Sequence, residues 1–375
     1  MKIAYIARRR IPSVHAHAVQ IVKMCDAFGR LGHEVKLFAN LGDDKPTALF
    51  DRYGVNRTFE VDVFPKRIKR FLRPRFAARL LRHPFIREAD LCFGRDITAL
   101  AALSLANKPI VYEAHTIPPV GSNRWRLLAW MFGRRNFSHL VCVTSTLADL
   151  HREQFRRLAD KPIIVAPNAA ADATPPDSNL SWPGRQDAIQ VGFVGRPFPG
   201  KGIELIVDAA RTLPALDFHL VGASKDDLNW IEGSLPQNLY LHGYQPHGRL
   251  GSYFARFDIA VAPYCAKVMN ASRLESAAIT SPLKLLEYMA AGLPSIVSDL
   301  PGVKDILDGT SDEVTVLVPP GDRRAFVEAI KRLAGDGPLR ERIGKAARAR
   351  YLEKHTSIDR ARKVLGDLAE SSGQA

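Results

Sequence analysis

The stretch Gly195-Arg196-Pro197-Phe198-Pro199-Gly200-Lys201-Gly202 decides the fold of this chain. It follows an apolar run, residues 190–194, that is typical of a buried strand, and it precedes residues 203–212, whose apolar spacing predicts a helix. Glycines let the backbone approach an anion closely, and a helix start offers free N–H groups to it. Arg196 and Lys201 add two cations, in a spacing that matches neither the P-loop nor Gly-x-Gly-x-x-Gly. Taken alone, the string fits either a diphosphate site or an ordinary turn with solvated cations.

Strand-like and helix-like runs alternate on both sides of this turn. Residues 2–7, 17–31 and 34–39 form a strand–helix–strand unit, which predicts a parallel sheet with a right-handed crossover. With 375 residues the chain exceeds one typical domain, and residues 169–186, rich in Ala, Pro, Asp and Ser, are typical of a connection. We therefore expect two doubly wound α/β domains that bind ligands outside the carboxyl ends of their strands.

A second string, residues 281–294, contains a further candidate site. Pro282 suits the first turn of a helix, where its missing N–H costs nothing. Lys284 and Glu287 are three positions apart and therefore share a helix face. A carboxylate suits the two hydroxyls of a ribose, and a helix start beside a lysine suits phosphate. A surface ion pair of little energetic value is the alternative.

These two strings, in this order and separation, resemble the donor-binding half of family-4-type retaining glycosyltransferases with the GT-B fold, the glycosyl transferases of group 1. Looser matches run along nearly the whole chain, at residues 13–20, 31–35, 112–115, 143–145, 166–168 and 257–263. The resemblance implies two facing Rossmann-like domains with a cleft between them. The expected parts are an acceptor-side domain (1–165), a linker (166–187), a nucleotide-sugar-binding domain (188–350) and a C-terminal helix crossing back to the first domain (351–375).

The resemblance also implies roles for individual residues. Those expected at the donor are Gly195, Arg196, Lys201, Gly243, Tyr244, Ser281, Leu283, Lys284, Leu285 and Glu287. Arg196 and Lys201 would contact the diphosphate, Glu287 the ribose, and the N–H groups of Leu283 and Leu285 the phosphates. The base would lie against the loop at residues 243–244.

Transfer with retention, as the family performs it, is thought to need no protein nucleophile. Arg196 and Lys201 would stabilise the leaving diphosphate electrostatically, and His115 would face the transferred sugar; alternatively, His115 satisfies a strand-end carbonyl. We expect no metal and no cofactor beyond the donor, since no Asp-x-Asp pair is present. Ile279 stands where the family pattern has the first Glu of E-x7-E, so Glu275 or Ser281 would substitute, or the sugar is held differently.

The net charge of +14 calls for an anionic partner. No nucleic-acid-binding pattern accompanies it, so we expect no nucleic-acid partner. Residues 66–82 interleave cations with large apolar side chains, which suits an anionic membrane surface, although Pro74 and Pro84 also allow a solvated loop. The cations expected to contact the membrane or acceptor are Lys66, Arg67, Lys69, Arg70 and Arg73.

No signal peptide, spanning segment or paired-cysteine pattern is present in the sequence. We therefore expect a cytoplasmic protein, or one peripheral on the cytosolic face of the inner membrane. The favoured function is retaining transfer from a UDP- or GDP-linked sugar to a glycan or lipid-linked acceptor, in the biosynthesis of envelope polysaccharide, lipopolysaccharide or glycolipid. A catalytically inactive nucleotide-sugar-binding partner and a UDP-sugar epimerase of the same architecture are the alternatives.

Overall fold

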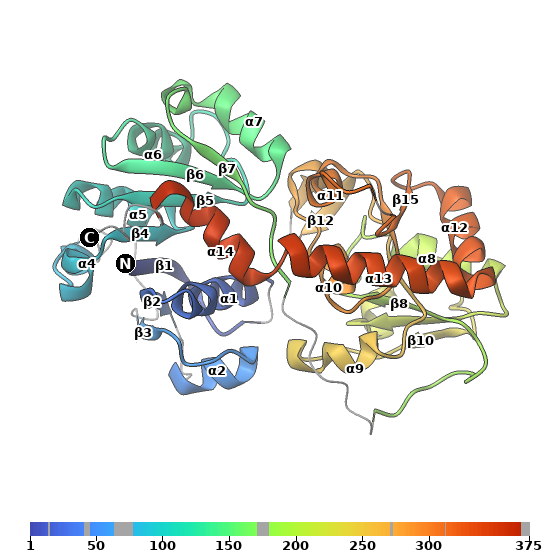
Figure 1. The fold of residues 1–375 in the computed structure, drawn as a ribbon. Helices are drawn as coiled ribbons and strands as arrows, with labels where there is room; N and C mark the ends of the chain where they lie inside the picture. Colours follow the sequence, from blue (N-terminus) through green and yellow to red (C-terminus); the bar gives the residue numbers. More distant parts are fainter. Residues whose placement is uncertain are drawn as a thin grey trace. The chain divides into compact units, whose positions relative to one another are not determined.

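The computed structural model describes residues 1–13, 16–40, 46–63, 78–170, 180–270, 273–311 and 313–368. The chain divides into two compact units, shown in Figure 1. Unit 1 consists of Met1–Pro167 and Ser357–Ala375, and unit 2 of Asn168–Thr356. Each unit contains a parallel sheet with helices packed on it. The prediction of two Rossmann-like α/β domains is confirmed.

The described strands of unit 1 form one sheet in the order β3-β2-β1-β4-β5-β6-β7, and all neighbours are parallel. The strands are β1 (Lys2–Arg10), β2 (Glu34–Asn40), β3 (Glu60–Val63), β4 (Leu91–Gly94), β5 (Ile110–Ala114), β6 (Phe137–Cys142) and β7 (Ile163–Val165). The strand order reverses between β1 and β4. In open α/β sheets, the carboxyl ends of the strands at such a reversal are where ligands bind.

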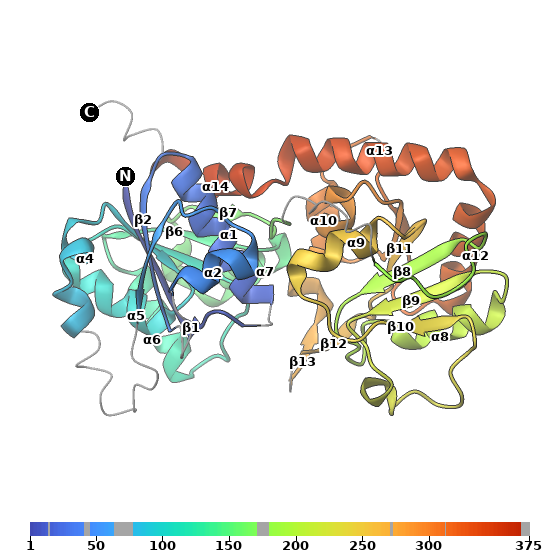
Figure 2. The same ribbon diagram turned by 90° about the horizontal axis from the view of Figure 1, so that it is seen from below.

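The helices of unit 1 include one from the far end of the chain. Those whose bounds the structure describes are α1 (Ala16–Arg30), α2 (Pro46–Tyr53), α4 (Pro84–Glu88), α5 (Ile97–Leu103), α6 (Asn123–Phe132), α7 (Ser145–Gln154) and α14 (Ser357–Leu365). Side-chain caps begin three of them, with Asp96, Ser122 and Thr144 accepting from backbone N–H groups. Helix α14 lies beside α1 (Figure 2). Its apolar residues are buried in the core that α1 and β1 build, so the last helix belongs to unit 1.

The described strands of unit 2 form a second sheet in the order β10-β9-β8-β11-β14-β15. They are β8 (Gln190–Val194), β9 (Asp217–Val221), β10 (Leu239–Leu241), β11 (Ile259–Ala262), β14 (Ser295–Ser298) and β15 (Val316–Val318). An antiparallel hairpin, β12 (Lys267–Asn270) and β13 (Arg273–Ser276), stands apart from this sheet. The order reverses between β8 and β11, which places the glycine string that follows β8 at the reversal.

Helices cover both faces of this second sheet. They are α8 (Ile203–Thr212), α9 (Leu250–Phe254), α10 (Leu283–Ala290), α11 (Pro301–Leu307), α12 (Arg323–Gly335) and α13 (Gly337–Lys354). One buried cluster joins the sheet to α8 and α12, and another joins it to α9, α10 and α11. The two clusters hold the starts of α8 and α10 at fixed places beside the strand ends.

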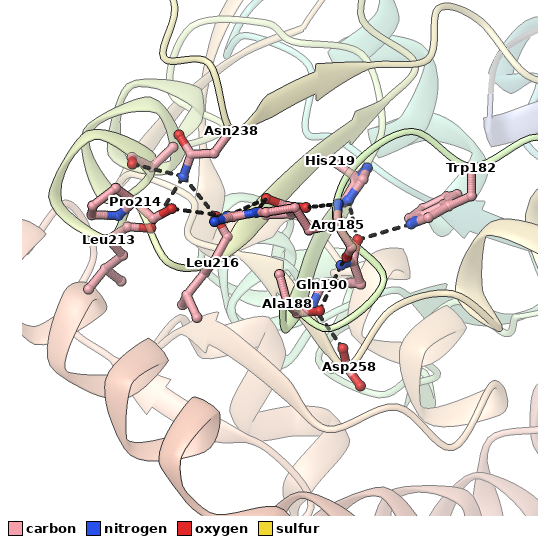
Figure 3. Close-up of polar contacts among 12 residues, drawn as sticks. Trp182, Arg185, Ala188, Gln190, Leu213, Pro214, Leu216, His219, Asn238 and Asp258 are labelled. Carbon is pink, nitrogen blue, oxygen red and sulfur yellow. Dashed lines mark hydrogen bonds and ion pairs between the residues drawn. The ribbon is translucent and has the colours of Figure 1, made fainter.

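The segment that leads into β8 is anchored on unit 2, as Figure 3 shows. Trp182 stacks on the ring of His219 with centroids 4.2 Å apart and donates to Gln190 Oε1 at 2.9 Å. Arg185 donates to the carboxylate of Asp217 through its backbone N–H, Nε and Nη2. Asp217 is completely buried, so this pairing fixes the chain just before the first strand of the sheet.

Candidate functional site

The glycine string forms a tight turn at the carboxyl edge of the unit 2 sheet. Gly202 precedes α8 with φ of +75°, and a Cβ there would collide with the carbonyl oxygen of Pro263, so only glycine fits. Gly195 lies against Lys284, because a Cβ at Gly195 would be 3.5 Å from Lys284 Cε. The two strings singled out in the sequence therefore meet in space at the point where the strand order reverses.

Cations gather at this turn. Lys201 Nζ and Arg196 Cζ lie 5.2 and 5.8 Å from the centroid of the Phe198 ring. Burial, followed by the charges of Lys284 and Arg196, lowers the pKa of Lys201 to about 8. Within the described part of the chain, no carboxylate pairs with Lys201. A cation that lacks a carboxylate partner and lies beside further cations favours the binding of an anion there.

A buried carboxylate lies beside these cations. Glu287 accepts from Lys284 Nζ at 2.5 Å on Oε2 and contacts His247 Nε2 at 3.2 Å on Oε1. Burial opposes its charge, but Lys284 and His247 outweigh burial and lower its pKa to about 2. The side chain is 4% exposed, so the pair with Lys284 is not the surface ion pair that the spacing alone also allowed. His247, in the short 3-10 turn His247–Arg249, was not singled out in the sequence.

At the start of α10, the N–H groups predicted to bind phosphate already donate hydrogen bonds within the protein. The N–H of Leu283 donates to the Ser281 carbonyl oxygen, and that of Leu285 donates to the Pro282 carbonyl oxygen. The hydroxyl oxygen of Ser281 accepts from the N–H of Asn168 at 2.9 Å. Phosphate binding through Leu283 and Leu285 would require these turn bonds to be exchanged, and the role stays a prediction.

The loop expected to contact the base begins at the end of β10. The N–H of Gly243 donates to the Ala223 carbonyl oxygen, and its own carbonyl oxygen accepts from Gly222, which ties this loop to the strand end beside Gly195. Tyr244 is 58% exposed and therefore presents a free aromatic face. Ile279 ends the short 3-10 turn Ala277–Ile279 and is half-buried.

A second charged cluster lies in unit 1, around the carboxylate of Glu113 in β5. Glu113 Oε1 accepts from Arg95 at 3.0 Å and from Arg360 of α14 at 2.7 Å, and it lies 2.9 Å from His115 Nε2. Burial opposes ionisation of Glu113, but the charges of Arg360 and Arg95 hold its pKa well below the usual range. Burial, aided by Arg95, lowers the pKa of His115 to about 4. The hydrogen-bond partner of His115 is thus a carboxylate. The alternative drawn from the sequence was that His115 satisfies a strand-end carbonyl.

The remaining sequence predictions concern the basic segment and the metal. Lys66, Arg67, Lys69, Arg70 and Arg73 lie outside the described residues. Across the parts of the chain that the structure describes, no group of three or more His, Cys, Asp or Glu side chains could hold a metal ion. Arg95, Glu113 and Arg360 were not predicted from the sequence. The signal available for Arg95 and Glu113 was charge at the ends of two buried strands, and Arg360 lies on helix α14.

In comparisons with known proteins, two family models match the two halves of the chain. Residues 188–336 match the family described as glycosyl transferases group 1, and residues 17–172 match glycosyltransferase family 4. A sulfoquinovosyl transferase of Arabidopsis thaliana is 27% identical over 277 residues, which cover 67% of this chain and 50% of that protein. The chain thus spans about half the length of the curated relatives it matches.

Solved structures match over the full chain. A glycosyltransferase from Rickettsia africae superimposes with a TM-score of 0.74 at 13% identity, covering 100% of this chain and 99% of that one. HepE of Anabaena in complex with UDP-glucose gives a TM-score of 0.69 at 16% identity, covering 99% of this chain and 100% of that one. At such identities the likeness shows the fold alone.

Proposed function

Because this chain belongs to the glycosyl transferases of group 1 and family 4, with the GT-B fold, we propose that it moves a sugar from a nucleotide diphosphate sugar to an acceptor. The observation that carries the proposal is the uncompensated cation Lys201 beside Arg196 and Lys284 at the glycine turn of unit 2. A diphosphate supplies the charge that this group of cations lacks. Glu287, held ionised beside it, provides a carboxylate for ribose hydroxyls.

The proposal draws further support from a structure of the same fold, HepE of Anabaena, which was solved in complex with UDP-glucose. The direct test is a thermal-shift panel of UDP-, GDP-, ADP- and CMP-sugars on the native protein and on Glu287→Ala. A ligand that binds the native state raises stability by mass action. A shift with one nucleotide class, lost in Glu287→Ala, supports the donor site and identifies the base. A panel without any shift overturns the proposal.

For the chemistry, we propose transfer with retention and without a resident metal. Arg196 and Lys201 stabilise the leaving diphosphate, and His115 faces the transferred sugar. The configuration of the product's new glycosidic bond, read by NMR, tests retention; an inverted product contradicts it. Unchanged turnover in the presence of EDTA is expected, and loss of turnover that added Mg²⁺ or Mn²⁺ restores contradicts the absence of a metal.

The acceptor proposal is a glycan or a lipid-linked glycan of envelope polysaccharide, lipopolysaccharide or glycolipid assembly, reached at the cytosolic face of a membrane. It rests on the basic and apolar composition of residues 66–82 and on the net charge of +14. In the part of the chain that the structure describes, no helix is long and apolar enough to cross a membrane. Flotation with anionic vesicles tests docking, and absence of the protein from the floated fraction contradicts it.

The second candidate function is a nucleotide-sugar-binding partner without activity. Ile279 favours it, since a hydrocarbon side chain replaces the first carboxylate of the family pattern. Slow hydrolysis of the bound nucleotide sugar in the absence of acceptor decides between the two. Release of free sugar supports the enzyme, and tight binding without release supports the inactive partner.

A further inference from the structure

The buried cluster of unit 1 has an uneven charge. Two guanidinium groups, Arg95 and Arg360, surround the carboxylate of Glu113, and their side chains are 14% and 3% exposed. Tyr5 adds a neutral donor, with its hydroxyl 3.4 Å from the second carboxylate oxygen. With two positive charges against one negative charge, a third positive charge on His115 would be repelled and poorly solvated. The imidazole is therefore neutral, in agreement with its lowered pKa.

A neutral imidazole carries a single proton, and its hydrogen-bond partner decides which nitrogen holds it. His115 Nε2 lies 2.9 Å from Glu113 Oε1, and an ionised carboxylate can only accept. Nε2 must therefore be the protonated nitrogen. Nδ1 then keeps a lone pair, and among the described residues it has no hydrogen-bond donor. The His115 side chain keeps 29% exposure at the carboxyl end of β5.

We propose that Glu113 is a positioning residue that fixes the Nε2–H tautomer of His115, so that Nδ1 is presented as a hydrogen-bond acceptor for a hydroxyl of the sugar. The role of the hydroxyl rests on the proposed function, whereas the tautomer is a property of the unliganded protein. Arg95 and Arg360 take part by keeping Glu113 ionised. A protonated Glu113 would itself be a donor and would admit the opposite tautomer.

The cluster brings together residues that are far apart in the sequence. Arg95 follows β4, Glu113 lies in the neighbouring β5, and Arg360 comes from α14. Arg360 Nε donates in addition to the Pro167 carbonyl oxygen at 2.7 Å, which fixes the guanidinium where it reaches Glu113. The last helix of unit 1 therefore contributes to the geometry of His115 without contacting it.

The tautomer can be read directly by long-range ¹H–¹⁵N NMR on the full chain labelled with ¹⁵N-histidine. The chain has 11 histidines, and His115→Gln assigns the signal. We expect a protonated Nε2, a bare Nδ1 and a ring that stays neutral well below pH 6. A protonated Nδ1, or a mixture of tautomers, in the native protein overturns the proposal, and the variant serves only to assign the signal.

Glu113→Gln supplies the causal test, with Glu88→Gln as its control. Glu88 is an exposed carboxylate of unit 1, paired with Lys2 at the surface. An amide can donate as well as accept, so we expect the Nδ1–H tautomer to appear in Glu113→Gln and not in Glu88→Gln. An unchanged pure Nε2–H signal in Glu113→Gln overturns the proposal.

Turnover of UDP-glucose, measured as sugar release, tests the consequence. We expect at least a tenfold loss in Glu113→Gln with UDP affinity unchanged, since the proposed nucleotide contacts lie in unit 2. Equal turnover in the two variants overturns the role of Nδ1. If none of the UDP-, GDP-, ADP- and CMP-sugars binds the native protein, the proposed function fails, and the NMR experiment still decides the tautomer.

Discussion

Arg360 and Glu113 are 247 positions apart, yet Arg360 Nη2 donates to Glu113 Oε1 at 2.7 Å in the interior of unit 1. Glu113 lies in a central strand, and Arg360 lies on the last helix of the chain. This ion pair fastens α14 to the sheet through charge, in addition to the apolar contacts of Ala361, Val364 and Leu365. It also makes the integrity of the His115 environment depend on the end of the chain.

Replacing Arg360 with Met should destabilise unit 1 strongly. The change leaves Glu113 buried with Arg95 as its remaining cation, and breaking a buried pair by removing one partner costs roughly 3–5 kcal/mol. We expect a loss near the lower limit, because Arg95 still compensates part of the charge. Urea unfolding followed by circular dichroism measures it.

Arg362→Met is the matched control for that experiment. Arg362 lies on the same helix, but its side chain is 65% exposed and pairs with Asp359 one turn away. Such a surface pair contributes at most about 1 kcal/mol. Equal losses for the two variants would mean that the buried pair does not hold the helix.

Lys201 should make nucleotide affinity depend on pH. Burial and the neighbouring cations lower its pKa to about 8, and a bound diphosphate would raise that pKa. The free protein therefore loses the proton above about pH 8, and binding must restore it. The Kd for UDP should rise about tenfold between about pH 7 and pH 9.

Titration calorimetry of UDP at several pH values measures this effect. Lys201→Met should weaken binding and remove the slope above pH 8. Lys331→Met is the control, since Lys331 is an exposed residue of α12 paired with Glu328. A slope that persists in Lys201→Met would assign the titration to another group.

Glu287→Gln should weaken UDP binding by about ten- to a hundredfold, since hydrogen bonds to charged groups contribute roughly 1.5–3 kcal/mol. The substitution keeps the shape of the side chain but removes the charge that Lys284 and His247 contact. Calorimetry with UDP measures it, and Glu328→Gln, an exposed carboxylate of the same unit, should bind as the native protein does. If Glu287→Gln bound UDP with native affinity, the carboxylate of Glu287 would not contribute to nucleotide binding.

The unit 2 site could be read from the sequence to the extent that its contacts are local. The pairing of Lys284 with Glu287 and the positive φ of the turn at Gly202 depend on neighbours along the chain, and the structure has both. The close approach of Gly202 to the Pro263 carbonyl oxygen comes from a distant part of the chain. His247 reaches Glu287 from 40 positions away, through a turn whose path no spacing rule specifies. Its contribution could not be predicted.

The unit 1 cluster was harder to predict from the sequence, because its members are far apart along the chain. His115 was singled out through the family resemblance, whereas Arg95 and Glu113 stood in the sequence as charges beside buried strands. What joins them is the parallel pairing of β4 with β5 and the return of α14. The sequence of a buried strand shows that Glu113 needs a compensating charge, but not which of the many arginines provides it.

The stability of unit 2 should fall as the pH is lowered through the ordinary histidine range. His219 Nε2 lies 2.7 Å from Gln190 Oε1 (Figure 3). His219 Nδ1 lies 3.0 Å from His242 Nε2, and Trp182 stacks on both rings. Burial, followed by the charge of His242, lowers the pKa of His219 to about 3, although Asp217 opposes the shift. Burial lowers that of His242 to about 4.

Both folded-state values lie below the ordinary histidine value of about 6.5, so the unfolded chain binds protons first as the pH falls. The stability that the neutral pair contributes is therefore complete above about pH 6.5 and is lost toward pH 4. Each imidazole should contribute about 1 kcal/mol of this loss by about pH 5.5. Urea unfolding followed by tryptophan fluorescence at about pH 7.5 and 5.5 measures it. A variant with both His219→Gln and His242→Gln should show a much smaller difference, and a difference equal to that of the native protein would place the titration elsewhere.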